Sequence, residues 1–276
     1  NPAIGLGNLW GLLSDPSAFS GAGHRMYRPA LLVSFACNTL VSPAAWSLKG
    51  GNVLLHATAA WLLWRWLRSS RVSARGSFAV AAVFAVHPLL SECVNLVSAR
   101  SELLLAIGVL VALLAHRRWQ LARGPAWLAL LGMVGGTLLA CGSKETGVVL
   151  PALLAVQTFA ARPRHADGID WRRAVVGIVP VVAVVIAYLL LRRMLLGQAT
   201  VDLMARTAGD ATMGHGRTLL VQFATMGTLL PKALLQMVVP VGLTLAPPVV
   251  YRESLLDPFA LVGWLSVGAL SGAAAW

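Results

Sequence analysis

Residues 174–193 read AVVGIVPVVAVVIAYLLLRR, a largely apolar run that contains one proline and ends in two arginines. About 20 residues in an α-helix match the thickness of a bilayer's hydrocarbon core. Similar runs recur along the chain, whose 276 residues are 58% hydrophobic and only 12% charged. Soluble domains carry about 25% charged residues. This composition excludes a soluble globular enzyme and a disordered chain, and it predicts a polytopic membrane protein.

Hydropathy and helix-breaking residues predict an all-α helical bundle with seven to nine apolar helices and additional interfacial helices. The apolar stretch at 30–41 is short enough for an interfacial helix or a half-span. The segment 215–238 contains Pro231 and Lys232, so a full crossing and a re-entrant loop both remain open. The expected spans lie at 48–67, 76–91, 102–116, 126–141, 146–161, 174–193 and 257–276.

These segments predict four parts along the chain. Residues 1–47 are expected to form an extracytoplasmic loop with interfacial helices, and 48–193 the transmembrane core. Residues 194–256 are expected to be extracytoplasmic or re-entrant, and 257–276 to begin a further transmembrane helix. Because the chain opens with Asn1-Pro2 and closes within an apolar stretch, we expect it to be cut from a longer protein.

The net charge of +12 comes mainly from arginines that flank the apolar segments. Three basic loops, at 65–75, 116–123 and 162–173, fall on one side if each segment crosses once. The positive-inside rule makes that side cytoplasmic, so the charge requires no nucleic-acid partner. The three cysteines form no pattern typical of a metal site or a disulfide framework.

Two polar stretches at the opposite ends of the spans could carry chemistry. The stretch His87–Glu92 precedes Ser98-Ala99-Arg100-Ser101-Glu102, and here a carboxylate could act as a general base while the arginine holds a phosphate. The alternative is that Glu92 and Arg100 pair with each other and only cap helix ends. In Ser143-Lys144-Glu145-Thr146, the lysine could reach a phosphate and the glutamate a sugar, or the stretch is a solvated hairpin turn.

Two further motifs flank or enter the spans. Tyr27-Arg28-Pro29 could bind a lipid phosphate, but an anchor in the headgroup layer is the favoured interpretation. Asn52 and His56 lie four residues apart and therefore share one helix face. Interhelical hydrogen bonding is the favoured role for this pair, and direct contact with a ligand is the alternative.

Taken in order, these motifs resemble those of the transmembrane and tetratricopeptide-repeat O-mannosyltransferases and their bacterial relatives. Those enzymes belong to the GT-C class of polyprenyl-phosphate-sugar-dependent glycosyltransferases. The matching pairs are Tyr27-Arg28-Pro29 with YRP, Asn52–Ala57 with VNxLLHA, His87–Leu104 with HPxHTExV…SGRADLL, and Ser143–Pro151 with (S/A)KExxxxLP. The resemblance runs from residue 1 to about 160, and more weakly to 250.

The resemblance implies inverting transfer of a sugar from a polyprenyl-phosphate lipid to an acceptor, a protein hydroxyl or a glycan, on the non-cytoplasmic face. It implies an integral protein of the bacterial inner membrane with its site facing the periplasm. A divalent cation would be compatible with the acids, but no ligand cluster supports a metal. The expected site residues are the acids Glu92, Glu102 and Glu145, the phosphate ligands Lys144, Arg100 and Arg28, and the supporting His87, Tyr27, Asn52 and His56.

Some positions depart from the family pattern. Leu90 replaces the second histidine of HPxHTE, and SGRAD reads Ser-Ala-Arg-Ser-Glu at 98–102. In the family a tandem acidic pair stands just upstream of an Asn-Pro like Asn1-Pro2, so we expect the catalytic base and the first span before residue 1. The rival hypothesis is a non-catalytic GT-C-like subunit that associates with other membrane subunits. A transporter fits less well, because the ionisable residues gather at one membrane face and inverted repeats are not evident.

Overall fold

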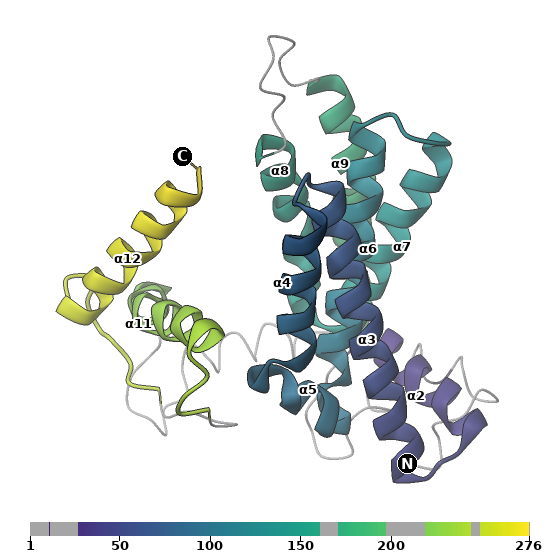
Figure 1. Cartoon of the computed structure of the whole chain (residues 1–276), viewed down its shortest axis with the longest axis horizontal. Helices are drawn as coiled ribbons and strands as arrows, with labels where there is room; N and C mark the ends of the chain where they lie inside the picture. Colours follow the sequence, from purple (N-terminus) through teal and green to yellow (C-terminus); the bar gives the residue numbers. More distant parts are fainter. Residues whose placement is uncertain (1–10, 12–26, 161–170, 197–218, 244–248, 276) are drawn as a thin grey trace. The chain divides into compact units, whose positions relative to one another are not determined.

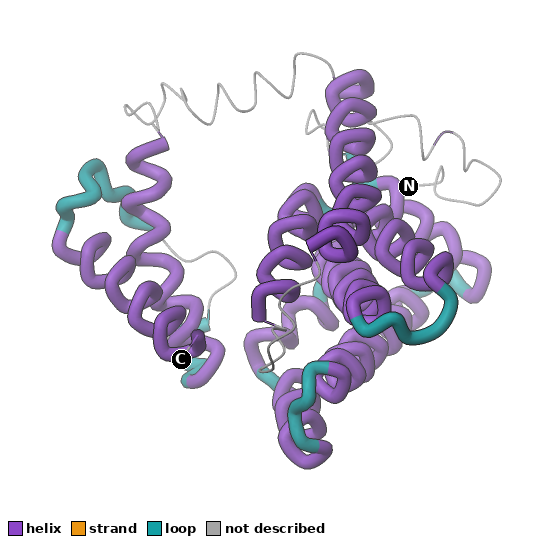
Figure 2. The backbone as a smooth tube through the Cα atoms, turned by 90° about the horizontal axis from the view of Figure 1, so that it is seen from above, coloured by secondary structure: helices purple, strands orange, loops and turns teal. Residues whose placement is uncertain are grey.

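The computed structural model describes residues 11, 27–160, 171–196, 219–243 and 249–275. This part of the chain consists of α-helices and short 3-10 helices, with no strand among the residues described (Figure 2). The all-α fold class is therefore confirmed for it. The chain forms two compact units. Unit 1 comprises Asn1–Val86 and Leu90–Gly197, and unit 2 comprises His87–Leu89 and Gln198–Trp276.

Four long helices build unit 1. In Figure 1, α3, α6 and α7 stand side by side, and α6 packs most extensively against α7. The close approach of α6 and α7 depends on Gly108 of α6 and Gly136 of α7. A Cβ at either position would lie 2.6 Å from the other glycine's carbonyl oxygen. The long helices are α3 (Ala45–Ser69), α6 (Arg100–Gln120), α7 (Ala126–Ser143) and α9 (Trp171–Leu196).

Shorter helices complete unit 1, and prolines mark several of their ends. Pro29 begins α2, where its missing N–H costs no helical hydrogen bond. Pro88 follows His87 and ends α4, because a residue before proline avoids the helical conformation. The short elements are α2 (Pro29–Val41), α4 (Ala74–Val86), α5 (Ser91–Asn95), α8 (Leu150–Ala160), η4 (Val97–Ala99) and η5 (Glu145–Val149), and η3 (Pro88–Leu90) lies between α4 and α5.

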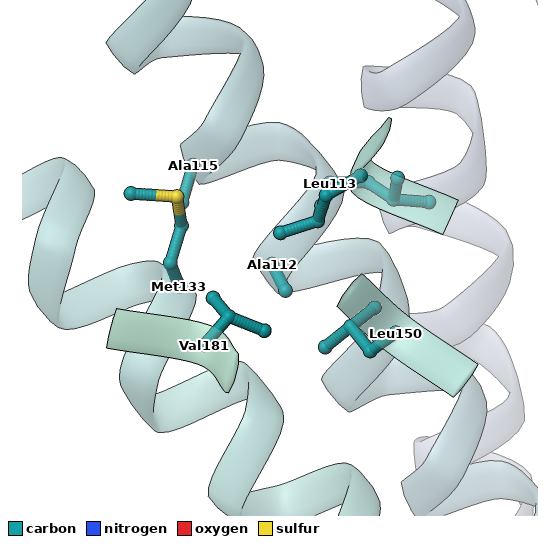
Figure 3. Close-up of a cluster of buried hydrophobic side chains, with 7 residues drawn as sticks. Ala112, Leu113, Ala115, Met133, Leu150 and Val181 are labelled. Carbon is teal, nitrogen blue, oxygen red and sulfur yellow. The ribbon is translucent and has the colours of Figure 1, made fainter. Parts of the chain in front are cut away.

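The core of unit 1 lies where α6, α7, α8 and α9 meet (Figure 3). Met133 and Val181 are fully buried there, as are Leu150 and Leu154. Small residues of α6 such as Ala112 face these larger side chains, which lets the helices pack closely. Burial of a leucine or methionine side chain contributes about 1.5–3 kcal/mol in water. For helices that also contact lipid, tight packing supplies more of the stability.

Unit 2 is built on α11 (Leu219–Val238) and α12 (Pro258–Ala275). The two helices cross at glycines, since a Cβ on Gly227 would lie 2.6 Å from the carbonyl oxygen of Ala260. Phe223 stacks on Trp264 with ring centroids 4.3 Å apart. The α11 helix continues through Pro231, so the segment predicted at 215–238 is one helix over its described residues.

Fewer membrane spans are found than the hydropathy pattern predicted. Among the described residues, Val97–Gln120, Ala126–Ser143 and Arg172–Leu196 are long and apolar enough to cross a membrane. The helices Ala74–Val86 and Pro88–Asn95, bent by 50°, would add a fourth span if they form one. The expected seven to nine are not found there. One reason is that α8 has only 11 residues, and another is that α3 contains Lys49 and three buried polar side chains.

Candidate functional site

Arg100 begins α6 and is the largest fully buried side chain of the described residues, with 1% of its surface exposed. Its Nε donates to Asn52 Oδ1 at 2.7 Å, and its Nη2 donates to Asn38 Oδ1 at 2.9 Å. The carbonyl oxygens of Leu48 and Ser34 accept from Nη2 and Nη1, at 2.8 and 3.2 Å. The guanidinium is thus held by α2 and α3, and the Glu92–Arg100 pair considered from the sequence does not form.

Asn52 and His56 make the interhelical hydrogen bonds that their spacing predicted. Besides accepting from Arg100, Asn52 donates Nδ2 to the carbonyl oxygens of Val94 and Leu96, at 3.2 and 3.3 Å. His56 Nε2 lies 3.0 Å from the carbonyl oxygen of Ala85 and its ring stacks on Phe84. Both side chains are buried and tie α3 to the bent segment around α4 and α5.

The stretch Ser143–Glu145 is a sharp break in the helix. The α7 helix ends at Ser143, and Lys144 is extended, with φ −154° and ψ 145°. The 3-10 helix η5 then begins at Glu145 and runs close to α7. The approach is so close at Gly147 that a Cβ there would lie 2.6 Å from the backbone of Ala140. Two adjacent charged side chains therefore reach different neighbours, Lys144 towards α6 and Glu145 towards α2 and α9.

Glu145 is shared by two arginines. Arg28 Nη2 lies 3.0 Å from its Oε2, and Arg192 Nη2 lies 3.6 Å from its Oε1. Burial raises the pKa of Glu145, but the hydrogen bond from Arg28 and both positive charges outweigh it, so its pKa lies below the ordinary value. The carboxyl is therefore ionised at neutral pH. Arg192 Nε is buried and has no acceptor among the described residues.

Lys144 forms an ion pair with Glu102 of α6, one turn or less from the buried Arg100. Both side chains are about a third exposed, so this pair borders the solvent-accessible surface. Glu92 is exposed in the first turn of α5 and has no ion pair within the described structure. The Nδ1 of His87 accepts from the backbone N–H of Leu89 at 3.2 Å, which is a turn-capping role.

Tyr27, which directly precedes Arg28, is buried against α9. It is 6% exposed and its ring stacks on Tyr188 of α9, with centroids 6.4 Å apart. Burial raises the pKa of the Tyr27 hydroxyl, which keeps it neutral. The aromatic pair belongs to a buried apolar cluster with Val185 and Leu196 of α9.

The structure thus joins three motifs that lie far apart in the sequence. We name as the charged cluster the residues Arg28, Glu102, Lys144, Glu145 and Arg192. Sequence reasoning missed Arg192, Tyr188 and the Asn38 amide that holds Arg100. The only sequence signal for Arg192 is its place at the end of an apolar run, where arginines usually act as interfacial anchors.

The described residues contain no group of three or more His, Cys, Asp or Glu side chains that could hold a metal ion. In the charged cluster each carboxylate faces a cation, an arrangement that suits an anionic oxygen ligand better than a metal. A phosphate group could exchange with Glu145 or Glu102 as the partner of these cations.

Comparison with known proteins indicates the class. The chain is distantly similar, at about 30% identity over half its length, to protein O-mannosyltransferases of the TMTC type, which are GT-C membrane glycosyltransferases. It is 35% identical over 144 residues to the Drosophila melanogaster protein O-mannosyl-transferase Tmtc1, and 33% over 176 residues to Tmtc2 of the same organism. Mouse TMTC2 is 29% identical over 155 residues.

These matches cover 51%, 60% and 54% of this chain but only 16–18% of each relative. The chain thus spans less than one fifth of the length of the curated relatives it matches. No protein-family model matches the chain, and no solved structure matches it.

Proposed function

We propose that the chain forms part of a membrane glycosyltransferase whose charged cluster binds the phosphate of a polyprenyl-phosphate sugar. The observation that supports this most directly is that the adjacent residues Lys144 and Glu145 each anchor an ion-paired group, and the two groups together contain three cations and two carboxylates. Three positive and two negative charges leave a net charge of +1 to attract a phosphodiester. The similarity to O-mannosyltransferases supports the same type of reaction.

The cations would act on the leaving group. An acceptor oxygen loses its proton to a carboxylate and bonds to the anomeric carbon, while the bond from that carbon to the phosphate oxygen breaks. The phosphodiester carries one negative charge, and the departing polyprenyl phosphate gains a second. Arg28, Lys144 and Arg192 would therefore stabilise the transition state more than the bound donor, which is the requirement for catalysis.

The acids would have separate roles. Glu145 is a weak base because two arginines lower its pKa, so we assign it the positioning of both guanidiniums. Glu102 positions Lys144 in the same way. The exposed Glu92 is the carboxylate we assign to contact with the acceptor or with a divalent cation. The proposed base is the acidic pair that the family resemblance implies before Asn1.

Arg100 would act indirectly. Its guanidinium is enclosed by protein acceptors, so we assign it the positioning of α2 against α3 and α6 rather than contact with the phosphate. Because α2 follows directly on Arg28, this connection would fix the distance between Arg28 and Glu145. We place the charged cluster on the non-cytoplasmic side of a bacterial inner membrane, since the arginine-rich helix ends lie at the opposite end of unit 1.

The test is transfer of radiolabelled mannose from a polyprenyl-phosphate donor by the full-length protein in detergent. Arg192→Gln and Lys144→Ala should each lower transfer about 100-fold, as expected when a charge-stabilising group is removed. The matched control is Arg193→Gln, an exposed arginine one residue further along α9, which should leave transfer within twofold. Unchanged turnover in both cluster variants would exclude these assignments. A wild-type protein that neither binds nor consumes the donor would support the non-catalytic subunit.

A further inference from the structure

A second candidate site lies at the other end of unit 1, where α3 and α6 end and α7 begins. A pocket of about 390 Å³ opens there. Arginines form one part of its wall and apolar side chains the other. The lining that matters for its chemistry is Arg65, Arg117, Arg118 and Arg123, with Leu114 and Leu128. None of these residues belongs to the charged cluster.

The pocket concentrates positive charge. Its lining contains four arginines and no carboxylate, and none of the four has an ion-pair partner among the described residues. Arg71 and Arg123 lie close enough to Arg117 for like-charge repulsion. Such repulsion weakens the folded state unless an anion relieves it, so the pocket is built to favour an anionic ligand.

Arg117 is the clearest sign of a ligand. Its side chain is only 8% exposed, and its Nε has a long hydrogen bond of 3.4 Å to the carbonyl oxygen of Ser69. No acceptor among the described residues meets its two terminal nitrogens. These nitrogens are not among the buried unpaired atoms of the described residues, so they are accessible from the pocket, where a phosphate oxygen could accept from them.

The turn between α6 and α7 holds two of the other arginines in place. The backbone N–H of Arg123 donates to Arg118 O at 3.0 Å, and that of Ala122 donates to Trp119 O at 3.1 Å. Ala122 has a positive φ of 51°. This pattern is a Schellman motif, which ends a helix and reverses the chain. It brings Arg123 back beside Arg118 at the pocket's rim.

The apolar wall distinguishes a lipid from a soluble anion. Leu114, Leu121 and Leu128 line the pocket beside the arginines, and Trp127 next to it is 59% exposed. The helices α6 and α7 are both candidate membrane spans. Their ends would therefore lie at the depth of lipid headgroups, where basic pockets between helices recognise anionic lipids.

We propose that this pocket binds the headgroup phosphate of an anionic phospholipid, with the arginines on the phosphate and the leucines against the glycerol and first acyl carbons. This site is independent of the proposed transferase reaction. It would anchor the ends of α3, α6 and α7 to one another through a shared lipid.

The test compares phosphatidylglycerol with phosphatidylcholine of the same acyl chains, added to delipidated full-length protein in detergent and counted by native mass spectrometry. The wild type should bind phosphatidylglycerol at least tenfold more tightly. The double variant Arg118→Gln/Arg123→Gln should lose most of this preference. The matched control, Arg68→Gln/Arg75→Gln, removes the same charge from exposed arginines outside the lining and should stay within twofold of the wild type.

Two further arms keep the outcome decisive. The variant Arg118→Lys/Arg123→Lys retains charge and should bind phosphatidylglycerol with at most a severalfold loss, which shows that failure of the glutamine variant is not misfolding. Glycerol phosphate, a headgroup without acyl chains, should not displace the lipid. Equal loss in the pocket and control variants, equal binding of both lipids, or full displacement by glycerol phosphate would each overturn the proposal.

Discussion

The network around Arg100 shows how a single residue can organise a membrane-embedded structure. A buried guanidinium must use its donors inside the protein, because leaving them without acceptors costs several kcal/mol. Here two asparagine side chains and two backbone carbonyls serve it, and the ring of Phe35 lies 4.6 Å from its central carbon. The amide nitrogens of Asn38 and Asn52 donate to other groups, Ser47 Oγ and backbone carbonyls, so the network extends beyond Arg100.

Gly51 leaves the space that this network needs. A Cβ there would lie 2.3 Å from Asn38 Oδ1 and 3.0 Å from Arg100 Nη2, whereas a Cβ on Gly50 would meet nothing within 4 Å. We expect Gly51→Ala to lower stability by about 1–3 kcal/mol through overpacking. The control Gly50→Ala should be neutral or slightly stabilising. Thermal unfolding of the purified protein in detergent measures both, and equal melting temperatures would contradict the role of Gly51.

The lowered pKa of Glu145 predicts that the stability of the folded protein depends on pH. Its folded pKa is depressed below its ordinary value of 4.5, so its ionised form stabilises the folded state above pH 4.5, and this contribution disappears as the pH falls through the folded pKa. The stability difference between wild type and Glu145→Gln should be constant from pH 7 to about pH 5 and shrink below 4.5. Arg28 and Arg192 are the cause, so Arg28→Gln should reduce the same difference. A gap that widens at low pH would contradict the pairing.

At the scale of helices, close packing depends on small residues at the crossings. The helices α6 and α7 touch backbone to backbone at Gly108 and Gly136, and α11 and α12 do so at Gly227. Apolar side chains that face lipid and those that face a neighbouring helix are equally hydrophobic, so burial of area does not drive the helices together. Van der Waals packing between the helices does, and it improves as the two backbones come closer. Glycine, which has no side chain, permits the closest approach.

Adjacent glycines on α7 provide a matched test of this contact. A Cβ on Gly136 would lie 2.6 Å from Gly108 O and 2.8 Å from Ala112 N, but a Cβ on Gly135 meets nothing within 4 Å. Gly136→Ala should destabilise unit 1 by about 1–3 kcal/mol, since backbone atoms must move. Gly135→Ala should instead stabilise it by up to about 1 kcal/mol through helix propensity. Chemical denaturation in mixed micelles should give opposite signs, and equal shifts would contradict the crossing.

At the scale of unit 1, the two ends of the bundle differ in charge. At one end the basic termini of α3, α6 and α9 meet. Arg117 Nε donates a hydrogen bond to the carbonyl oxygen of Ser69. The side chains of Trp119 and Arg173 each donate to the other residue's carbonyl oxygen. The other end carries the charged cluster, with paired carboxylates and cations. The α6 helix connects the two ends and, at 1.5 Å per residue, is about 30 Å long.

This polarity predicts a membrane topology. In a variant whose three cysteines are replaced by alanine, Glu92→Cys and Arg123→Cys should react with a membrane-impermeant maleimide from opposite sides. Arg123→Cys, at the arginine-rich end, should be labelled only when the cytoplasmic face is accessible to the reagent. Labelling of Glu92→Cys in intact cells with an outer membrane made permeable is the positive control for exposure. Reaction of both cysteines from the same side would show that α6 does not cross the membrane.

The sequence by itself determined the membrane class and the helical fold, and it proposed the residues that could take part in chemistry. These features follow from composition and from short-range patterns, such as the proline that begins α2 and the polar break after Ser143. Asn52 and His56 were predictable as interhelical donors for the same reason, because polar side chains within an apolar helix must find partners. The number of spans was not predictable, since hydropathy does not show where a helix bends, as between α4 and α5.

Only the tertiary structure decided how these residues combine. Arg28 meets Glu145 across 117 positions of the chain, and Arg192 joins them from a third helix. The sequence also suggested Arg100 as a direct phosphate ligand, whereas the fold encloses it among protein acceptors. The physical reason is that lipid is as apolar as a protein core, so an apolar run does not reveal which face of a helix turns inward. The packing of the helices sets how each helix is rotated about its own axis, and this rotation determines the partner of each charged side chain.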